Sequence, residues 1–242
     1  MNTNSLAYAS GALLLGLVTL FFGDFAKQWQ AVPKWIPAMP FAYLSGAILA
    51  AGGALILARK EKLGALILTS FFALWVVAFH LWPTLQSFSH IGAWNAPAES
   101  GFLVAGGLAL FAASMEGARK AIVLKSARLL GGACALVFGS AHFNYIDFTA
   151  TMVPAWIPPT QTFWAWATGF GHLLAGFALV SDTFARLAAA CLAGMMGSFV
   201  LLVHVPRLVN KPDDHVEWIM LAMSTTLTGA ALLLRKYATM AK

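Results

Sequence analysis

Charged residues are scarce in this sequence. Only 10% of its 242 residues are Asp, Glu, Lys or Arg, whereas soluble domains carry about 25%. Hydrophobic residues make up 60% of the chain and the mean hydropathy is +0.77, so too few polar side chains are present to cover a water-facing surface. This composition excludes a soluble enzyme, a disordered chain and a nucleic-acid-binding protein, although the net charge is +6.

Cysteine is also rare. Cys134 and Cys191 lie far apart within apolar runs and form no CxxC motif, so no disulfide framework is expected. The chain also lacks the CxxCH motif of covalent haem attachment.

Long apolar runs dominate what remains, and they predict an all-α membrane protein. A helix needs about 20 apolar residues to cross the hydrocarbon core, and the runs show no alternation of the kind found in membrane strands. Reading the runs between charges and prolines predicts about eight transmembrane helices. They cover residues 6–23, 41–58, 63–82, 98–115, 129–145, 162–180, 187–205 and 216–234.

Basic residues predict the direction of these spans. With eight crossings, the side that holds both chain ends carries eleven of the fifteen Lys and Arg residues. The other side carries Lys27, Lys34, Arg207 and Lys211. Because cytoplasmic loops are enriched in Lys and Arg, both termini are expected in the cytoplasm.

An internal repeat divides the chain. VPKWIP at 32–37 recurs as VPAWIP at 153–158, and His80-Leu-Trp-Pro resembles His204-Val-Pro. The chain is therefore interpreted as two four-helix units, 1–118 and 119–242, which run in the same direction because each has an even number of spans. Each proline-bracketed loop is expected to be a lid over its unit or a rigid connector.

Imidazole, carboxyl and indole groups gather in the outer half of this topology. All six histidines and all nine tryptophans fall there, which points to a surface that binds a flat ring, docks a partner or anchors in the interface. A histidine near mid-bilayer is a functional candidate by default. The candidate ligand-binding residues are His142, His172, His204, His80, Glu99, Glu217, Trp156, Trp166 and Trp35.

Two pairings among these residues can be estimated from helix geometry. His142 and His172 differ in depth by about 5–10 Å, which argues against a bis-histidine haem, and no Cys/His spacing typical of copper or zinc is present. Glu99 and Glu217 each begin a fourth span. Each either complements its helix dipole or pairs with a histidine of its own unit to move a proton or orient a ligand.

Four motifs in the second half carry a family resemblance. FGSAHF at 138–143, VPAWIP at 153–158, WAWATG at 164–169 followed by His172, and LVHVPR at 202–207 resemble the DoxX-like family of small bacterial membrane proteins. The first half resembles the same family more weakly, through Gly23-Asp-Phe and 32–37.

The resemblance implies a four-helix membrane bundle, here in tandem, in the bacterial inner membrane. Its relatives include the DoxD-type subunit of a thiosulfate:quinone oxidoreductase, and others are linked to redox stress. His142, His172 and Glu99 match positions that recur in similar sequences, whereas Glu217 precedes Trp218 where the acid usually follows the Trp.

Three functions remain open at this point. The first is a redox-linked subunit that binds a quinone or similar ring near the outer, periplasmic leaflet. The second is a non-enzymatic assembly subunit whose periplasmic tryptophans dock a protein partner, and the third is a small-molecule transporter built from parallel repeats. Whether the protein is an enzyme is left undecided.

Overall fold

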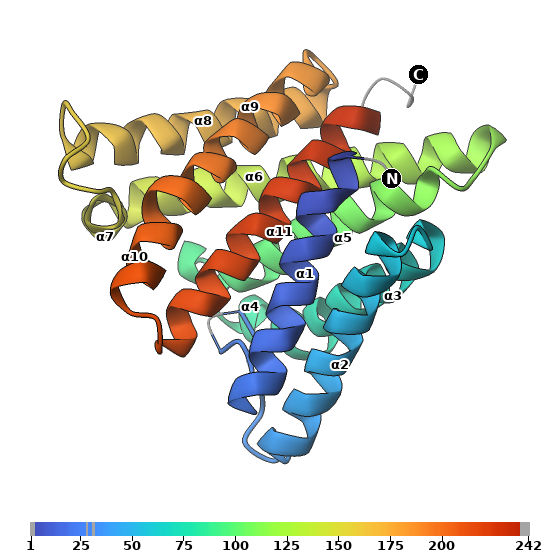
Figure 1. Cartoon of the computed structure of the whole chain (residues 1–242). Coiled ribbons are helices and arrows are strands. Elements are labelled where there is room, and N and C mark those ends of the chain that lie inside the picture. The colour runs from blue at the N-terminus through green and yellow to red at the C-terminus, as the bar shows by residue number, and fades with distance from the viewer. Residues whose placement is uncertain (1–2, 28, 31, 238–242) are drawn as a thin grey trace.

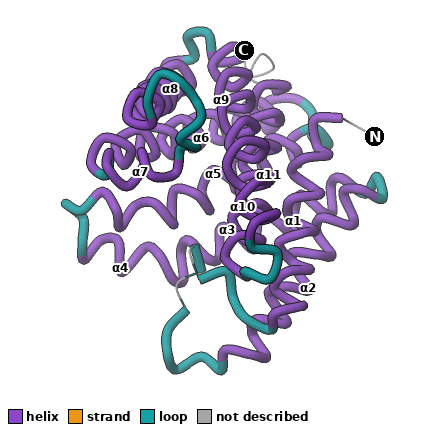
Figure 2. The backbone as a smooth tube through the Cα atoms, turned by 60° about the vertical axis from the view of Figure 1, so that its left-hand side comes forward, coloured by secondary structure: helices purple, strands orange, loops and turns teal. Residues whose placement is uncertain are grey.

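The computed structural model describes residues 3–27, 29–30 and 32–237, and this part of the chain is helical with no strand (Figures 1 and 2). The all-α membrane fold is confirmed. Seven helical segments are long and apolar enough to cross a membrane. Their helices are α1 (Thr3–Phe22), α2 (Ala38–Leu57), α3 (Glu61–Trp75), α6 (Gly117–Asn144), α8 (Gln161–Ser181), α9 (Ala185–Phe199) and α11 (His215–Tyr237).

The remaining expected span is α5 (Asn95–Ala112), a helix of 18 residues. Its first turns carry Asn95, Pro97, Glu99 and Ser100, which lower its hydropathy. Twelve of its residues are buried, so other helices, and not lipid, surround most of α5.

Two long segments continue past prolines at which the sequence analysis ended them. In the first, the π-helical turn η1 (Val76–His80) joins α3 to α4 (Leu81–Gln86). In the second, η3 (Val200–His204) joins α9 to α10 (Val205–Asn210). A proline ring clashes with the carbonyl four residues earlier in a regular helix, and in both cases that carbonyl lies in the wider π turn.

The start expected for the fifth span was also wrong. Residue 129 was chosen because Arg119, Lys120, Lys125 and Arg128 precede it, yet α6 begins at Gly117. Lys and Arg have good helix propensity, so a basic residue can mark the end of an apolar run while the helix itself continues. Reading apolar runs also missed the short helix α7 (Ile146–Met152) and the 3₁₀ turn η2 (Ile91–Trp94).

The long helices form two bundles that meet at α5 and α11 (Figure 1). In the first bundle, defined here as α1 to α5, the contacts run α1–α2, α2–α3 and α3–α5. In the second bundle, α6 to α11, they run α6–α8, α8–α9 and α9–α11. The bundles join through α5–α6, α11–α1 and α5–α11. The division into repeated units at residue 118 stays a prediction.

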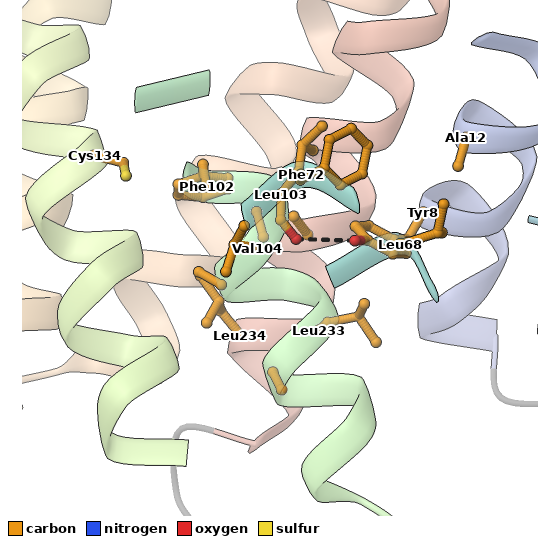
Figure 3. Packing of buried hydrophobic residues seen from close by; sticks show 14 of the residues in the cluster. Tyr8, Ala12, Leu68, Phe72, Phe102, Leu103, Val104, Cys134, Leu233 and Leu234 are labelled. Atoms are coloured by element: carbon orange, nitrogen blue, oxygen red, sulfur yellow. Dashed lines mark hydrogen bonds between the residues drawn. The ribbon is translucent and has the colours of Figure 1, made fainter. Parts of the chain in front are cut away.

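Small residues permit the close approach at the centre. A Cβ on Gly106 of α5 would lie 2.5 Å from the Cβ of Ala230 in α11, and a Cβ on Gly229 would overlap the backbone of Tyr8 in α1. The Tyr8 hydroxyl donates to the Leu103 carbonyl at 2.9 Å within this core (Figure 3). Such small-residue contacts are how membrane helices pack closely.

The two ends of the bundle differ. α1 begins and α11 ends toward the upper right of Figure 1, whereas α7 and α10 lie toward its left. At the first end, Arg128 on α6 donates to the Val180 carbonyl at 3.1 Å and to the Leu179 carbonyl, and its Nε lies 3.4 Å from the Asp182 carboxylate. A basic side chain there satisfies the last carbonyls of α8 and complements its dipole.

Candidate functional site

A cavity of about 680 Å³ lies inside the second bundle. Helices α6, α8, α9 and α11 form its walls, α5 of the first bundle closes one side, and α7 with the connection to Pro154 and Ile157 lies over its outer part. Four candidate residues from the sequence line it: His142, His172, His204 and Glu99. The structure therefore brings these four together.

His142 and His172 contact each other directly. Their ring centroids are 5.0 Å apart with the planes tilted by 51°. The two rings meet because α8 crosses α6 closely at Gly139 and Gly169, and their separation lies at the lower limit of the expected depth difference. Direct ring contact also leaves no room for a porphyrin plane between the two imidazoles, as a bis-histidine haem requires.

The hydrogen bond of His142 defines its neutral tautomer. His142 Nδ1 lies 2.8 Å from the Phe138 carbonyl oxygen. Because a carbonyl only accepts, Nδ1 carries the proton and Nε2 keeps a lone pair in the neutral ring. His142 can then accept a hydrogen bond from a ligand, and donates one only when it is protonated.

His172 and His204 present buried nitrogens without partners. His172 lies on α8, beside Phe138 and Phe199. His204 ends the π turn η3, which places it on the cavity wall. Both side chains are more than nine-tenths buried, and the Nδ1 atom of each has no hydrogen-bond partner in the described structure. Buried polar atoms are normally satisfied, so these two suit a ligand with polar atoms.

Of the two alternatives for Glu99, pairing with a histidine of its own unit is not what the structure shows. It lies on α5, which packs against α6, so its side chain lines the cavity of the second bundle while His80 lies in the first bundle. No salt bridge to Glu99 occurs among the described residues. The cavity thus holds a carboxyl group together with three imidazoles, and no basic side chain lines it.

The rest of the wall is apolar and aromatic. Trp164 belongs to it and its indole Nε1 donates to the Pro158 carbonyl at 2.8 Å, which ties α8 to the preceding loop. Apolar walls with a few convergent polar groups are typical of small-molecule sites. The other aromatic and sulfur-containing residues are Phe138, Tyr145, Phe148, Phe199, Met152, Met195, Met196 and Met220.

The proline-bracketed loops form matching turns. Ile36 N donates to the Pro33 carbonyl at 3.0 Å, and Ile157 N donates to the Pro154 carbonyl at 3.1 Å. The second turn contributes Pro154 and Ile157 to the cavity wall, whereas the indoles of Trp35 and Trp156 are 79% and 71% exposed.

Five candidates lie outside the cavity. Trp35 and Trp156 occupy the tips of their turns, and Trp166 packs against Phe143 and Phe170 instead. His80 is buried in the first bundle. Glu217 lies in the first turn of α11, where the helix dipole favours a carboxylate.

Sequence reasoning missed Trp164, Phe199 and the methionines of the wall. One signal was available for part of this set. Positions 124 residues apart pair α3 with α9 element by element, so Phe199 stands where the first bundle has Trp75, and Met196 stands where it has Phe72. Replacement of large rings by smaller or flexible side chains indicates space in the second bundle.

The described residues contain no group of three or more His, Cys, Asp or Glu side chains placed to hold a metal ion. His142, His172 and His204 instead line a cavity large enough for a small organic molecule.

These features define a helical membrane protein with several spans, whose second half holds an apolar cavity lined by three histidines and one glutamate. The DoxX family model matches residues 123–205, which run from α6 to the start of α10 and include all three cavity histidines. Residues 123–205 thus form a DoxX-like membrane domain, and the resemblance seen in the motifs of the second half is confirmed. The chain has no significant match among curated proteins or among solved structures.

Proposed function

We propose that this protein is a redox-linked membrane subunit whose second bundle binds a quinone or a similar planar ring. The observation that carries the proposal is the convergence of His142, His172, His204 and Glu99 on one apolar cavity of about 680 Å³. Cavities that bury drug-sized ligands fall in the range of about 300–1,000 Å³.

The three histidines would have different hydrogen-bonding roles toward the ring. The oxidised ring carries carbonyl oxygens, which accept only, so His172 and His204 are the donors that hold it. The reduced ring carries hydroxyl groups, which donate, and the Nε2 lone pair of His142 accepts from one of them. Glu99 is the acid that exchanges a proton with the ring, since it carries the only carboxyl group on the cavity wall.

The cavity lies toward the end of the bundle that carries α7. The distribution of Lys and Arg supports a periplasmic location for this end and cytoplasmic termini. A lipid-soluble ring would then reach the cavity from the outer leaflet of the inner membrane. The electrons for reduction of the ring would come from a partner protein.

Ligand titration of purified protein tests the proposal. Menadione and decylubiquinone should quench the part of the tryptophan fluorescence that is lost in Trp164→Phe, and His172→Ala should weaken this quenching at least tenfold. His90→Ala is the matched control, because His90 is exposed and outside the cavity. Equal affinities for wild type and His172→Ala, or no quenching by either quinone, would refute ring binding at this site.

Partner docking is a second candidate, and the exposure of Trp35 and Trp156 favours it. Indoles at the tips of two equivalent turns suit an interface, where tryptophan is enriched. A periplasmic protein partner should co-purify with the wild type and be lost from Trp35→Ala/Trp156→Ala. A monomeric wild type that retains no partner at any detergent concentration would contradict docking.

A further inference from the structure

The first bundle is built on the same frame as the cavity. Thr19 donates to the Leu15 carbonyl at 2.8 Å, and 123 residues later His142 makes the same i to i−4 bond to Phe138 at 2.8 Å. Gly16 faces Ala50 on α2, and Gly139 faces Leu173 on α8. Both members of the second pair lie 123 positions after those of the first. The two interiors can therefore be compared position by position.

The interior of the first bundle is filled by the connection between α1 and α2. Trp29 from this connection is 1% exposed and Phe25 is 2% exposed. The Trp29 ring centroid lies 5.6 Å from that of Phe72 and 6.1 Å from that of Trp75. These two wall positions correspond to Met196 and Phe199, which line the cavity of the second bundle.

Hydrogen bonds hold the connection in place. Gln30 Nε2 donates to Ser45 Oγ on α2 at 2.9 Å, and Ala26 N donates to Gln30 Oε1 at 2.9 Å. In the second bundle the corresponding connection forms α7, which contributes Phe148 and Met152 to the wall. The same architecture thus encloses an indole in one half and an open volume in the other.

The filled interior also resembles the open one in its polar groups. Trp29 Nε1, Trp75 Nε1 and His80 Nε2 are buried and have no hydrogen-bond partner among the residues that the structure describes. His80 ends η1 as His204 ends η3, so a buried imidazole faces each interior from the same place. The frame presents unpaired polar atoms around a flat ring in the first bundle and around the cavity in the second.

We propose that the first bundle contains a second ring-binding site, which the indole of Trp29 occupies as a built-in ligand. The site accepts a neutral, planar aromatic group of about the size of indole. In the wild type this site is filled, and removal of the Trp29 side chain opens it to a free ligand. The proposal does not require the second bundle to bind a quinone.

Rescue by free indole tests this site on the full chain in detergent. Trp29→Ala should lower the melting temperature, and millimolar indole should recover part of the loss. Trp82→Ala is the matched control, because Trp82 is 68% exposed and has no enclosed volume to refill. If Trp29→Ala does not fold, Trp29→Leu keeps more of the packing and should still respond to indole more than the wild type.

Counting bound ligand separates this site from the cavity of the second bundle. With 5-fluoroindole as probe, ¹⁹F NMR should show one more bound probe per chain in Trp29→Ala than in wild type. His172→Ala should not remove this additional signal. A folded Trp29 variant that binds no more 5-fluoroindole than wild type, and that indole does not stabilise, would overturn the proposal. Loss of quinone binding in wild type would leave it standing.

Discussion

Arg128 offers the sharpest test of how the second bundle is held together. Its side chain projects from the interior of α6 and is buried against the C-terminal end of α8, where it donates to the Leu179 and Val180 carbonyls and approaches Asp182. Hydrogen bonds to charged groups contribute about 1.5–3 kcal/mol each. The Asp182 carboxylate is 28% exposed, so the ion pair itself adds less than about 1 kcal/mol.

Replacing Arg128 by Ala should therefore lower the free energy of unfolding by about 3–6 kcal/mol, because both hydrogen bonds to the α8 carbonyls are lost. At roughly 2–4 °C per kcal/mol for a chain of this size, the melting temperature in detergent should fall by about 6–24 °C. Arg128→Lys should recover only part of the loss, since an ammonium is a point charge and lacks the planar fork of the guanidinium.

Thermal unfolding followed by circular dichroism or intrinsic fluorescence measures this effect. Arg119→Ala is the matched control, because Arg119 is exposed two turns earlier on the same helix. Melting temperatures of Arg128→Ala and Arg119→Ala that agree within about 2 °C would refute the reasoning, since the α8 carbonyls would then not depend on the guanidinium.

Three further changes test the centre and the outer loop. Gly229→Ala should lower the free energy of unfolding by about 1–3 kcal/mol, because the added Cβ meets the backbone of Tyr8. Gly194→Ala is the control and should be neutral or stabilising in melting temperature, because the space around Gly194 is open. Tyr8→Phe should cost about 0.5–1.5 kcal/mol in denaturant unfolding by removing the hydrogen bond to the Leu103 carbonyl. Burial raises the pKa of Asp24, but Lys27 and the Phe25 backbone N–H lower it by more, so the pKa lies below its ordinary value. The small stability that Asp24 contributes is therefore present at neutral pH and is lost as the pH falls below that ordinary value. Asp24→Asn should shift the melting temperature by less than Tyr8→Phe at pH 7, and a shift that does not shrink on acidification would contradict this.

Hydropathy and the scarcity of charge predicted the class of fold, because a bilayer requires long apolar segments with few charged residues. Each crossing needs an apolar length that the sequence displays, and the structure places helices at all eight positions. Ends were predicted less well. The start of α6 and the continuation past Pro83 depend on backbone hydrogen bonding that hydropathy does not report.

The candidate site was predicted residue by residue but not as a constellation. His142, His172, His204 and Glu99 were all singled out, but neither the shared cavity of Glu99 with the second-bundle histidines nor the direct contact of His142 with His172 was predicted. Both gaps have one cause. Distances along a helix can be estimated from a rise per residue, whereas the contact of α5 with α6 and the crossing of α6 with α8 are properties of packing between segments.

The difference between the two bundles follows from opposite demands on stability and binding. The Trp29 indole fills the first bundle with contacts to the rings of Phe72 and Trp75, and Leu49 adds further packing where the second bundle has His172. An open cavity gives up such contacts, because an open volume and unpaired buried imidazoles both cost free energy. Two equivalent open bundles would bear that cost twice within one chain. Trp29 instead packs against α3, and α3 in turn packs against α5, the helix that carries Glu99 to the cavity wall of the second bundle.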